Sequence, residues 1–237
     1  MSAERLQRII HTLSHRQNDV TVLLDEVHKP HNLSAIIRTC DAVGVPEVHA
    51  IETADQELKT FRRATAGSER WVNLNIHPHS DKQSTIEKFK SEGKQVLAAQ
   101  LSDKAVCYRE INFTRPTALI MGAEKWGVSP EIADQVDQHI IVPMHGMVES
   151  LNVSVATALI LFELERQRQA AGMYQNDCLD LDNPAIQKII FEWMQPKMAR
   201  MCREKDWEYP PLDQDGDILN PSEWYQQKQQ QQQTESK

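Results

Sequence analysis

Residues 140–156, IIVPMHGMVESLNVSVA, constrain the fold of this chain more than any other segment. Residues 140–142 predict the end of a buried strand, which Pro143 terminates because proline has no N–H to donate to a strand ladder. A glycine-containing loop follows, and Asn152 stands where a helix would begin. A strand, a polar loop and a helix commonly form a small-molecule site at strand ends. The segment alone is equally consistent with an ordinary turn in which Asn152 is only a helix cap.

Short apolar runs alternate with helical patterns along the rest of the chain. Strands are predicted at residues 20–24, 48–51, 71–76, 96–99, 118–121 and 140–142. Helices are predicted at residues 3–16, 33–43, 85–90 and 153–168, with one or two more within 184–204. This alternation indicates an α/β fold, with a mostly parallel sheet flanked by helices.

The length of 237 residues allows one domain with a full core and additional extensions. We predict an N-terminal helix in residues 1–18 and the main domain in 19–172. A helical extension is predicted in 173–205. An acidic, glutamine-rich tail, which we expect to be mobile, occupies 206–237.

Composition argues for an intracellular protein without a membrane span or a metal site. No apolar run approaches the roughly 18 residues that a span requires, and the charged N-terminus lacks a signal core. The cysteines are far apart and form no Cys-x-x-Cys: Cys40, Cys107, Cys178 and Cys202. We therefore expect free thiols in a reducing cytoplasm.

The net charge of −8 argues at first sight against a nucleic-acid partner, since RNA backbones are polyanions. Seven acidic residues and two lysines after residue 205 give the tail −5, which leaves −3 for the other residues. Basic clusters remain at Lys59, Arg62, Arg63 and Arg70, at Arg166 and Arg168, and at Lys197, Arg200, Arg203 and Lys205. Each cluster is either an ordinary solvated face or part of a larger basic surface, which would form if a dimer brought clusters of two chains together.

Two nucleotide-binding motifs are excluded. Gly122 and Gly127 have the spacing of a phosphate loop, but Val128 stands where that loop requires the lysine that reaches the phosphates. No Gly-x-Gly-x-x-Gly follows a predicted strand. An ATPase and a dinucleotide-binding oxidoreductase are therefore disfavoured.

Two further segments complete a set of three motifs. They are VHKPHNLSAIIRTCDAVGV at residues 27–45 and ALIMGAEKWGVSPE at residues 118–131. In this order the set resembles the SpoU family of RNA ribose 2′-O-methyltransferases, whose motifs carry an Asn and an Arg, a Gly-x-Glu-x-x-Gly and a Ser-Leu-Asn-Val-Ser. The similarity covers about residues 5–175. RQNDVTVLLDEVHKPHN and LERQRQAAGMY bring it closest to the TrmH branch, which methylates guanosine 18 of the tRNA D-loop, rather than to the ribosomal-RNA branch.

The resemblance implies a C-terminal trefoil knot and S-adenosylmethionine as cofactor. It implies that main chain near Ala99, Gly122, Val142 and Leu151 holds the adenine and ribose. Ala99 stands where relatives often have threonine, which matters little if main chain does the binding. Glycine also suits such a loop because it lets backbone approach a ligand closely.

The resemblance also implies a catalytic set of Arg38, Asn32, Glu124, Ser150 and Asn152. In the family the arginine is often described as the general base for the 2′-hydroxyl. A guanidinium stays protonated at neutral pH, so stabilisation of the developing alkoxide is the alternative. The alternative without a catalytic role is that Arg38 is a surface residue of a helix and forms an ion pair with Asp41.

The other four residues of this set can also be interpreted without a catalytic role. Asn32 and Asn152 hold loops or ribose, or only cap helices. Glu124 orients Arg38 or braces its loop, or is a solvated side chain beside Lys125. Ser150 is expected to contact the cofactor or the target nucleotide.

The family's terminal helices contact tRNA, which implies RNA contacts for Arg8, Arg16, Arg166 and Arg168. Trp126 is expected to stack a base, cover the cofactor or pack in the core. The implied function is methylation of a tRNA ribose by a homodimer. The alternatives are the same chemistry on ribosomal RNA and a tRNA-binding module without catalysis.

Overall fold

A computed structural model describes residues 3–54, 70–123, 126–174 and 179–235 of the chain. Predictions for Lys59, Arg62, Arg63, Glu124, Lys125 and Cys178 lie outside these residues. The chain divides into two compact units: Arg16–Gln175, and Met1–His15 together with Asn176–Lys237. The predicted N-terminal helix and the C-terminal segments thus belong to one unit, although they lie at opposite ends of the sequence.

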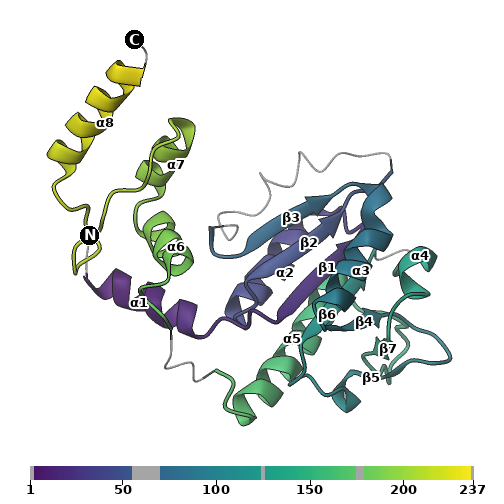
Figure 1. The fold of residues 1–237 in the computed structure, drawn as a ribbon. Coiled ribbons are helices and arrows are strands. Elements are labelled where there is room, and N and C mark those ends of the chain that lie inside the picture. The colour runs from purple at the N-terminus through teal and green to yellow at the C-terminus, as the bar shows by residue number, and fades with distance from the viewer. Residues whose placement is uncertain (1–2, 55–69, 124–125, 175–178, 236–237) are drawn as a thin grey trace. The chain divides into compact units, whose positions relative to one another are not determined.

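Unit Arg16–Gln175 is built on a seven-stranded sheet in the order β3-β2-β1-β6-β4-β7-β5 (Figure 1). The strands are β1 (Val20–Asp25), β2 (Glu47–Ile51), β3 (Asn73–His77), β4 (Gln95–Ala99), β5 (Val106–Cys107), β6 (Thr117–Gly122) and β7 (Gln138–Ile141). Every pairing is parallel, which confirms the predicted α/β fold. The two-residue β5 was not predicted, because a run this short carries no periodicity.

Helices cover both faces of this sheet, so its central strands are apolar on both sides. The helices of the unit are α2 (Pro30–Ala42), α3 (Lys82–Ser91), α4 (Pro130–Ala133) and α5 (Val153–Ala170), with 3-10 turns η3 (His79–Asp81) and η4 (Tyr108–Glu110). Val22 and Leu24 belong to the core under α2 and α5, whereas Leu23 belongs to the core under α3 and α4. This alternation follows from the two-residue period of a strand.

Helix α2 begins three residues earlier than predicted. Pro30 occupies the first turn of the helix, where a missing N–H costs nothing. The N-cap is therefore Lys29, and Asn32 lies inside the helix, buried. The purely capping interpretation of Asn32 is wrong.

The other unit is helical, with α1 (Ala3–Ser14), α6 (Pro184–Met194), α7 (Pro196–Glu204) and α8 (Pro221–Glu235). Ile9 and Leu13 of α1 pack with Ile190 and Met194 of α6 in a small core. The glutamine-rich part of the tail forms α8. The ring of Trp224 meets Trp207 edge-on at 5.7 Å between centroids, which ties the start of α8 to the unit.

No helix of the residues described above is long and apolar enough to span a membrane.

A buried arginine joins the end of α5 to the start of the sheet unit. Arg168 is 0% exposed, and its guanidinium donates to both carboxylate oxygens of Asp19, at 2.6 and 2.9 Å. It also donates to Gln17 Oε1 and to the carbonyl oxygens of Phe113 and Arg115, at 2.8–2.9 Å. Because the planar fork of arginine matches a carboxylate, one side chain holds three segments together.

We expect Arg168→Ala to lower the free energy of unfolding by about 3–5 kcal/mol, the range for removing one partner of a buried ion pair. Urea denaturation provides the measurement. The matched control is Arg166→Ala, two residues away, whose exposed side chain bonds only Glu163 among the described partners and whose loss should leave stability nearly unchanged. Equal effects of the two variants would contradict the structural role of Arg168.

Candidate functional site

A cavity of about 910 Å³ lies where β6, β4 and β7 end, in unit Arg16–Gln175. These strands are neighbours in the sheet and run parallel, so their carboxyl ends meet at one edge. The walls come from the three segments that follow these strands and from the first turns of α5. They include Ala99, Gln100, Leu101, Gly122, Ala123, Trp126, Gly127, Val142, Pro143, Met144, Glu149, Ser150, Leu151, Val153 and Ala156.

The segment after β6 turns back on itself so tightly that it requires glycine. A Cβ on Gly122 would lie 2.0 Å from the carbonyl carbon of Gly127 and 2.2 Å from the nitrogen of Val128. Gly127 has φ +70°, which glycine adopts without strain, and its N–H donates to the carbonyl of Ala123 at 2.8 Å. The close packing of Gly122 against the backbone of Gly127 and Val128 therefore depends on the absence of a side chain at residue 122.

All four residues predicted to hold the cofactor lie in the wall of this one cavity: Ala99, Gly122, Val142 and Leu151. Trp126 also lies there and is 75% exposed, so the core-packing interpretation of this residue is wrong. Sequence reasoning missed Gln100. Its Oε1 is buried and has no hydrogen-bond partner among the described residues, yet it lies in the wall.

The two predicted asparagines lie together although 120 residues separate them. Asn152 Nδ2 donates to Asn32 Oδ1 at 3.1 Å. Asn152 Oδ1 accepts from the N–H of Ser154 at 2.9 Å, so Asn152 is also the N-cap of α5. Asn152 can therefore cap α5 and also hold two motif segments together, because its Oδ1 accepts from Ser154 and its Nδ2 donates to Asn32.

Arg38 is exposed on α2 and is not part of the cavity wall of its own chain. The non-catalytic alternative predicted an ion pair between Arg38 and Asp41, but the Asp41 carboxylate accepts from Arg16 at 2.7 Å. No hydrogen bond or ion pair of the Arg38 side chain occurs with any residue that the structure describes. The guanidinium is thus available to an external anion.

Ser150 is exposed and lies in the cavity wall beside Leu151. Glu149 brings a carboxylate to the same wall, and no lysine or arginine lies among the described wall residues. The cavity therefore suits a ligand that is neutral or cationic.

Two of the arginines predicted to contact RNA do not reach the surface, so the prediction for them is wrong. Arg168 holds Asp19 in the interior, as described above. Arg16 is 6% exposed and donates to Asp41 and to the carbonyl of Trp71, at 2.7 and 2.8 Å. Sequence alone does not distinguish an arginine that pairs internally from one that meets a phosphate.

The other two predicted RNA contacts are exposed. Arg166 projects from α5, where its hydrogen bonds to Glu163 lower the pKa of that carboxyl to about 2. Arg8 is exposed on α1, in the helical unit.

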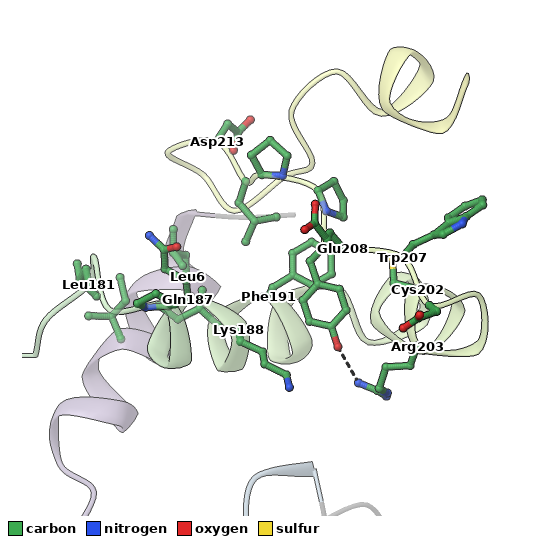
Figure 2. A pocket seen from close by; sticks show the side chains of 18 residues that line it. Leu6, Leu181, Gln187, Lys188, Phe191, Cys202, Arg203, Trp207, Glu208 and Asp213 are labelled. Carbon is green, nitrogen blue, oxygen red and sulfur yellow. Dashed lines mark hydrogen bonds between the residues drawn. The ribbon is translucent and has the colours of Figure 1, made fainter. Parts of the chain in front are cut away.

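A second cavity, of about 1000 Å³, lies within the helical unit (Figure 2). Its walls are largely apolar, and two of its polar residues, Arg203 and Tyr209, are hydrogen-bonded to each other. Arg203 donates to Tyr209 Oη at 3.1 Å and to Glu192 Oε1 at 3.0 Å, and the Tyr209 hydroxyl donates to the same carboxylate at 2.6 Å. Burial, followed by this bond to Glu192, raises the pKa of Tyr209, so the hydroxyl stays neutral at physiological pH. We therefore place the candidate site in the first cavity.

Among the described residues, no group of three histidine, cysteine or acidic side chains could hold a metal ion. The described wall of the first cavity is mostly apolar, and its polar side chains include the amide of Gln100, the carboxylate of Glu149 and the hydroxyl of Ser150.

Comparison with known proteins gives consistent matches. The SpoU rRNA methylase family matches residues 19–162, and its C-terminal region matches residues 166–221. The chain is 46% identical over 225 residues to the tRNA (guanosine(18)-2′-O)-methyltransferase of Escherichia coli, covering 95% of this chain and 97% of that one. It is also similar to the solved structure of a TrmH/SpoU tRNA modifying enzyme of Aquifex aeolicus, with a TM-score of 0.72, 42% identity, and 80% and 94% of the two chains covered. An AdoMet-bound rRNA methyltransferase of Sinorhizobium meliloti gives a TM-score of 0.54 and 35% identity, covering 64% of this chain and 57% of that one.

We expect Gly122→Ala to destabilise the protein by about 1–3 kcal/mol, since the added methyl group meets backbone that must shift. Gly146→Ala is the matched control, because Gly146 lies in the same cavity wall and a Cβ there meets nothing within 4 Å. That variant should stay within about 0.5 kcal/mol of the parent. Thermal or urea unfolding measures both, and a Gly122→Ala protein as stable as the Gly146→Ala protein would contradict the tight turn.

Proposed function

The chain belongs to the SpoU rRNA methylase family, and on this premise we propose that it transfers a methyl group from S-adenosylmethionine to the ribose 2′-oxygen of guanosine 18 in tRNA. One observation carries the choice of substrate. The similarity to the Escherichia coli tRNA (guanosine(18)-2′-O)-methyltransferase extends over nearly the full length of both chains. It therefore includes the helical unit as well as the sheet unit.

The cavity at the ends of β4, β6 and β7 fits S-adenosylmethionine. Its volume lies in the range of small-molecule sites. Gly122 and Gly127 lie in the wall, and Gln100 Oε1, which has no partner among the residues that the structure describes, is an acceptor for a ligand N–H. The Glu149 carboxylate suits the positive charge of the sulfonium.

We assign the cofactor to main-chain groups near Ala99, Gly122, Val142 and Leu151. When bound, S-adenosylmethionine supplies an electrophilic methyl group with a neutral thioether as leaving group. The protein therefore has to align the ribose hydroxyl and deal with the proton it loses.

Arg38 is the residue that we assign to the reacting hydroxyl. Its guanidinium is exposed and stays cationic at neutral pH, so stabilisation of the developing 2′-oxygen anion is the role that its chemistry favours. Action as a general base would require a substrate phosphate and burial to change its protonation. We assign Asn32 and Asn152 to holding the first and third motifs together, because their amides are hydrogen-bonded to each other.

The proposed RNA contacts are Arg166 on α5 and Arg8 on α1, together with the basic residues of α7. The proposed substrate places the protein in the cytoplasm, in agreement with the cysteine and hydropathy patterns of the sequence.

Incubation with methyl-labelled S-adenosylmethionine and unmodified tRNA tests the function. We expect label on the ribose of guanosine 18, mapped by mass spectrometry, and none on tRNA carrying adenosine at that position. Arg38→Ala should lower the rate of transfer by about 10²–10³-fold, the scale for losing one group that stabilises an oxyanion, while cofactor binding survives.

Arg109→Ala is the control, since it removes an exposed arginine that does not line the cavity. Label on a base would contradict ribose chemistry, and label on ribosomal RNA alone would favour the second candidate substrate. Salt-sensitive tRNA binding without any transfer would indicate a module without catalysis. Near-normal turnover of Arg38→Ala would remove that residue from its assigned role.

We further propose that two copies of the chain form a dimer through α5. Val155, Leu159 and Phe162 are 40–53% exposed and lie at intervals of four and three residues, which places them on one helix face. Met147 and Val148, just before the helix, are also exposed. Large apolar side chains exposed together on one helix face are typical of an interface. A second copy would also be a means of bringing an Arg38 to a cavity whose own chain does not supply one.

We expect Phe162→Glu to convert a dimer into a monomer at micromolar concentration, because it buries a charge in the apolar interface. Sedimentation velocity measures this. Leu219→Glu is the control, since Leu219 is 49% exposed but lies in the helical unit. A wild-type protein that sediments as a monomer would contradict the proposal.

A further inference from the structure

A buried ionic cluster lies at the carboxyl end of β1, beside the turn after β6. Asp25, the last residue of β1, is 1% exposed, and its Oδ1 lies 3.6 Å from the ammonium nitrogen of Lys82. Lys82 is also buried. It donates to Glu26 Oε1 at 2.7 Å and lies 3.5 Å from Glu131 Oε2. Burial lowers the pKa of Lys82, but the bond to Glu26 and the three carboxylate charges outweigh burial and raise it, so the ammonium stays charged.

The other oxygen of Asp25 binds the turn. Asp25 Oδ2 accepts from the backbone N–H of Ser129 at 2.6 Å, across 104 residues of sequence. In the sheet register Asp25 is also the partner of Gly122, where the same turn begins. The side chain and backbone of one residue thus reach both described ends of the turn, which includes the cavity residues Gly122, Trp126 and Gly127.

From these contacts we propose that Asp25, held by Lys82, is a positioning residue for methyl transfer, because its carboxylate fixes the turn that binds the cofactor. This inference rests on the proposed function for the identity of the cofactor. Glu124, predicted to be catalytic, lies in the sequence between the two ends that Asp25 holds.

Stability alone does not explain this cluster. Lys82 begins α3, where a positive charge opposes the helix dipole. A buried ion pair also contributes little net stability compared with apolar residues of the same size. What such a pair does provide is a fixed geometry, and here the geometry is that of the backbone in the cavity wall.

Two variants remove the bond from opposite sides. Asp25→Ala deletes the acceptor. Ser129→Pro deletes the donor and keeps the Asp25 carboxylate in the chain, and the φ of −61° at Ser129 suits the proline ring. Because the ring Cδ takes the place of the amide hydrogen, it also pushes Asp25 Oδ2 away from this end of the turn. We expect each to raise the Kd for S-adenosylmethionine, measured by calorimetry, by about tenfold, which corresponds to about 1.4 kcal/mol. The Kd for tRNA should stay unchanged. Asp25→Asn should recover most of the affinity, because an amide oxygen still accepts from Ser129.

Asp137→Ala is the matched control. Asp137 Oδ2 accepts from the backbone N–H of Val96 at 2.7 Å, the same kind of bond near the opposite edge of the sheet. It should leave the Kd for S-adenosylmethionine unchanged. Amide hydrogen exchange gives a readout that does not depend on catalysis: the Ser129 amide should exchange faster in Asp25→Ala and at the parental rate in Asp137→Ala.

The outcomes separate this inference from the proposed function. An Asp25→Ala or Ser129→Pro protein that binds S-adenosylmethionine as Asp137→Ala does would overturn the positioning role, whatever the substrate is. If Asp25→Ala does not fold, Ser129→Pro decides the question by itself. A wild-type protein that binds the cofactor but methylates no RNA would contradict the proposed reaction. The role of Asp25 would then still be decided by the hydrogen-exchange rate of the Ser129 amide and by the Kd for S-adenosylmethionine.

Discussion

The parallel pairing of β6 with β4 and of β4 with β7 is the constraint on which the site depends. Parallel neighbours end at the same edge, so segments that are far apart in the sequence must meet there. The crowding that results explains Gly122, since no residue with a Cβ fits against Gly127 and Val128. Among its described wall residues the cavity has one carboxylate, Glu149, and no lysine, arginine or histidine. The fold thus favours a reaction whose difficulty is alignment, with the reactive group brought by the cofactor.

The periodicity of the sequence was sufficient to predict the sheet and most of its helices, because apolar alternation and helix caps are local properties. The cap at Asn152 is an example, as its bond to Ser154 involves a neighbour in sequence. The bond from Asn152 to Asn32 and the bond from Ser129 to Asp25 are not local, and no spacing rule indicates them. Family resemblance named the first pair. It did not indicate the second, because the backbone donor at Ser129 would be present with any residue except proline.

Charge gave the least reliable sequence signal. Arg16 and Arg168 belong to segments that look basic, but each is buried against a carboxylate, Asp41 and Asp19 respectively. Counting arginines therefore overstates the cationic surface of the sheet unit. The acidic tail makes the net charge of the whole chain more negative, and this tail belongs to the helical unit. The value of −8 for the whole chain therefore does not describe the charge of either unit.

The two kinds of arginine in this chain show how environment decides the role of a guanidinium. Arg168 has carboxylate and carbonyl partners for its donors and no exposed surface, so its work is to hold the fold. Arg38 has an exposed side chain on a helix that packs against α5, which carries the third motif's cap. A cation that is solvated in the free protein loses its water only when an anion reaches it, and its electrostatic effect grows at that moment. Under the proposed function, the stabilisation assigned to Arg38 would therefore depend on bound RNA, which would link recognition of the substrate to the chemical step.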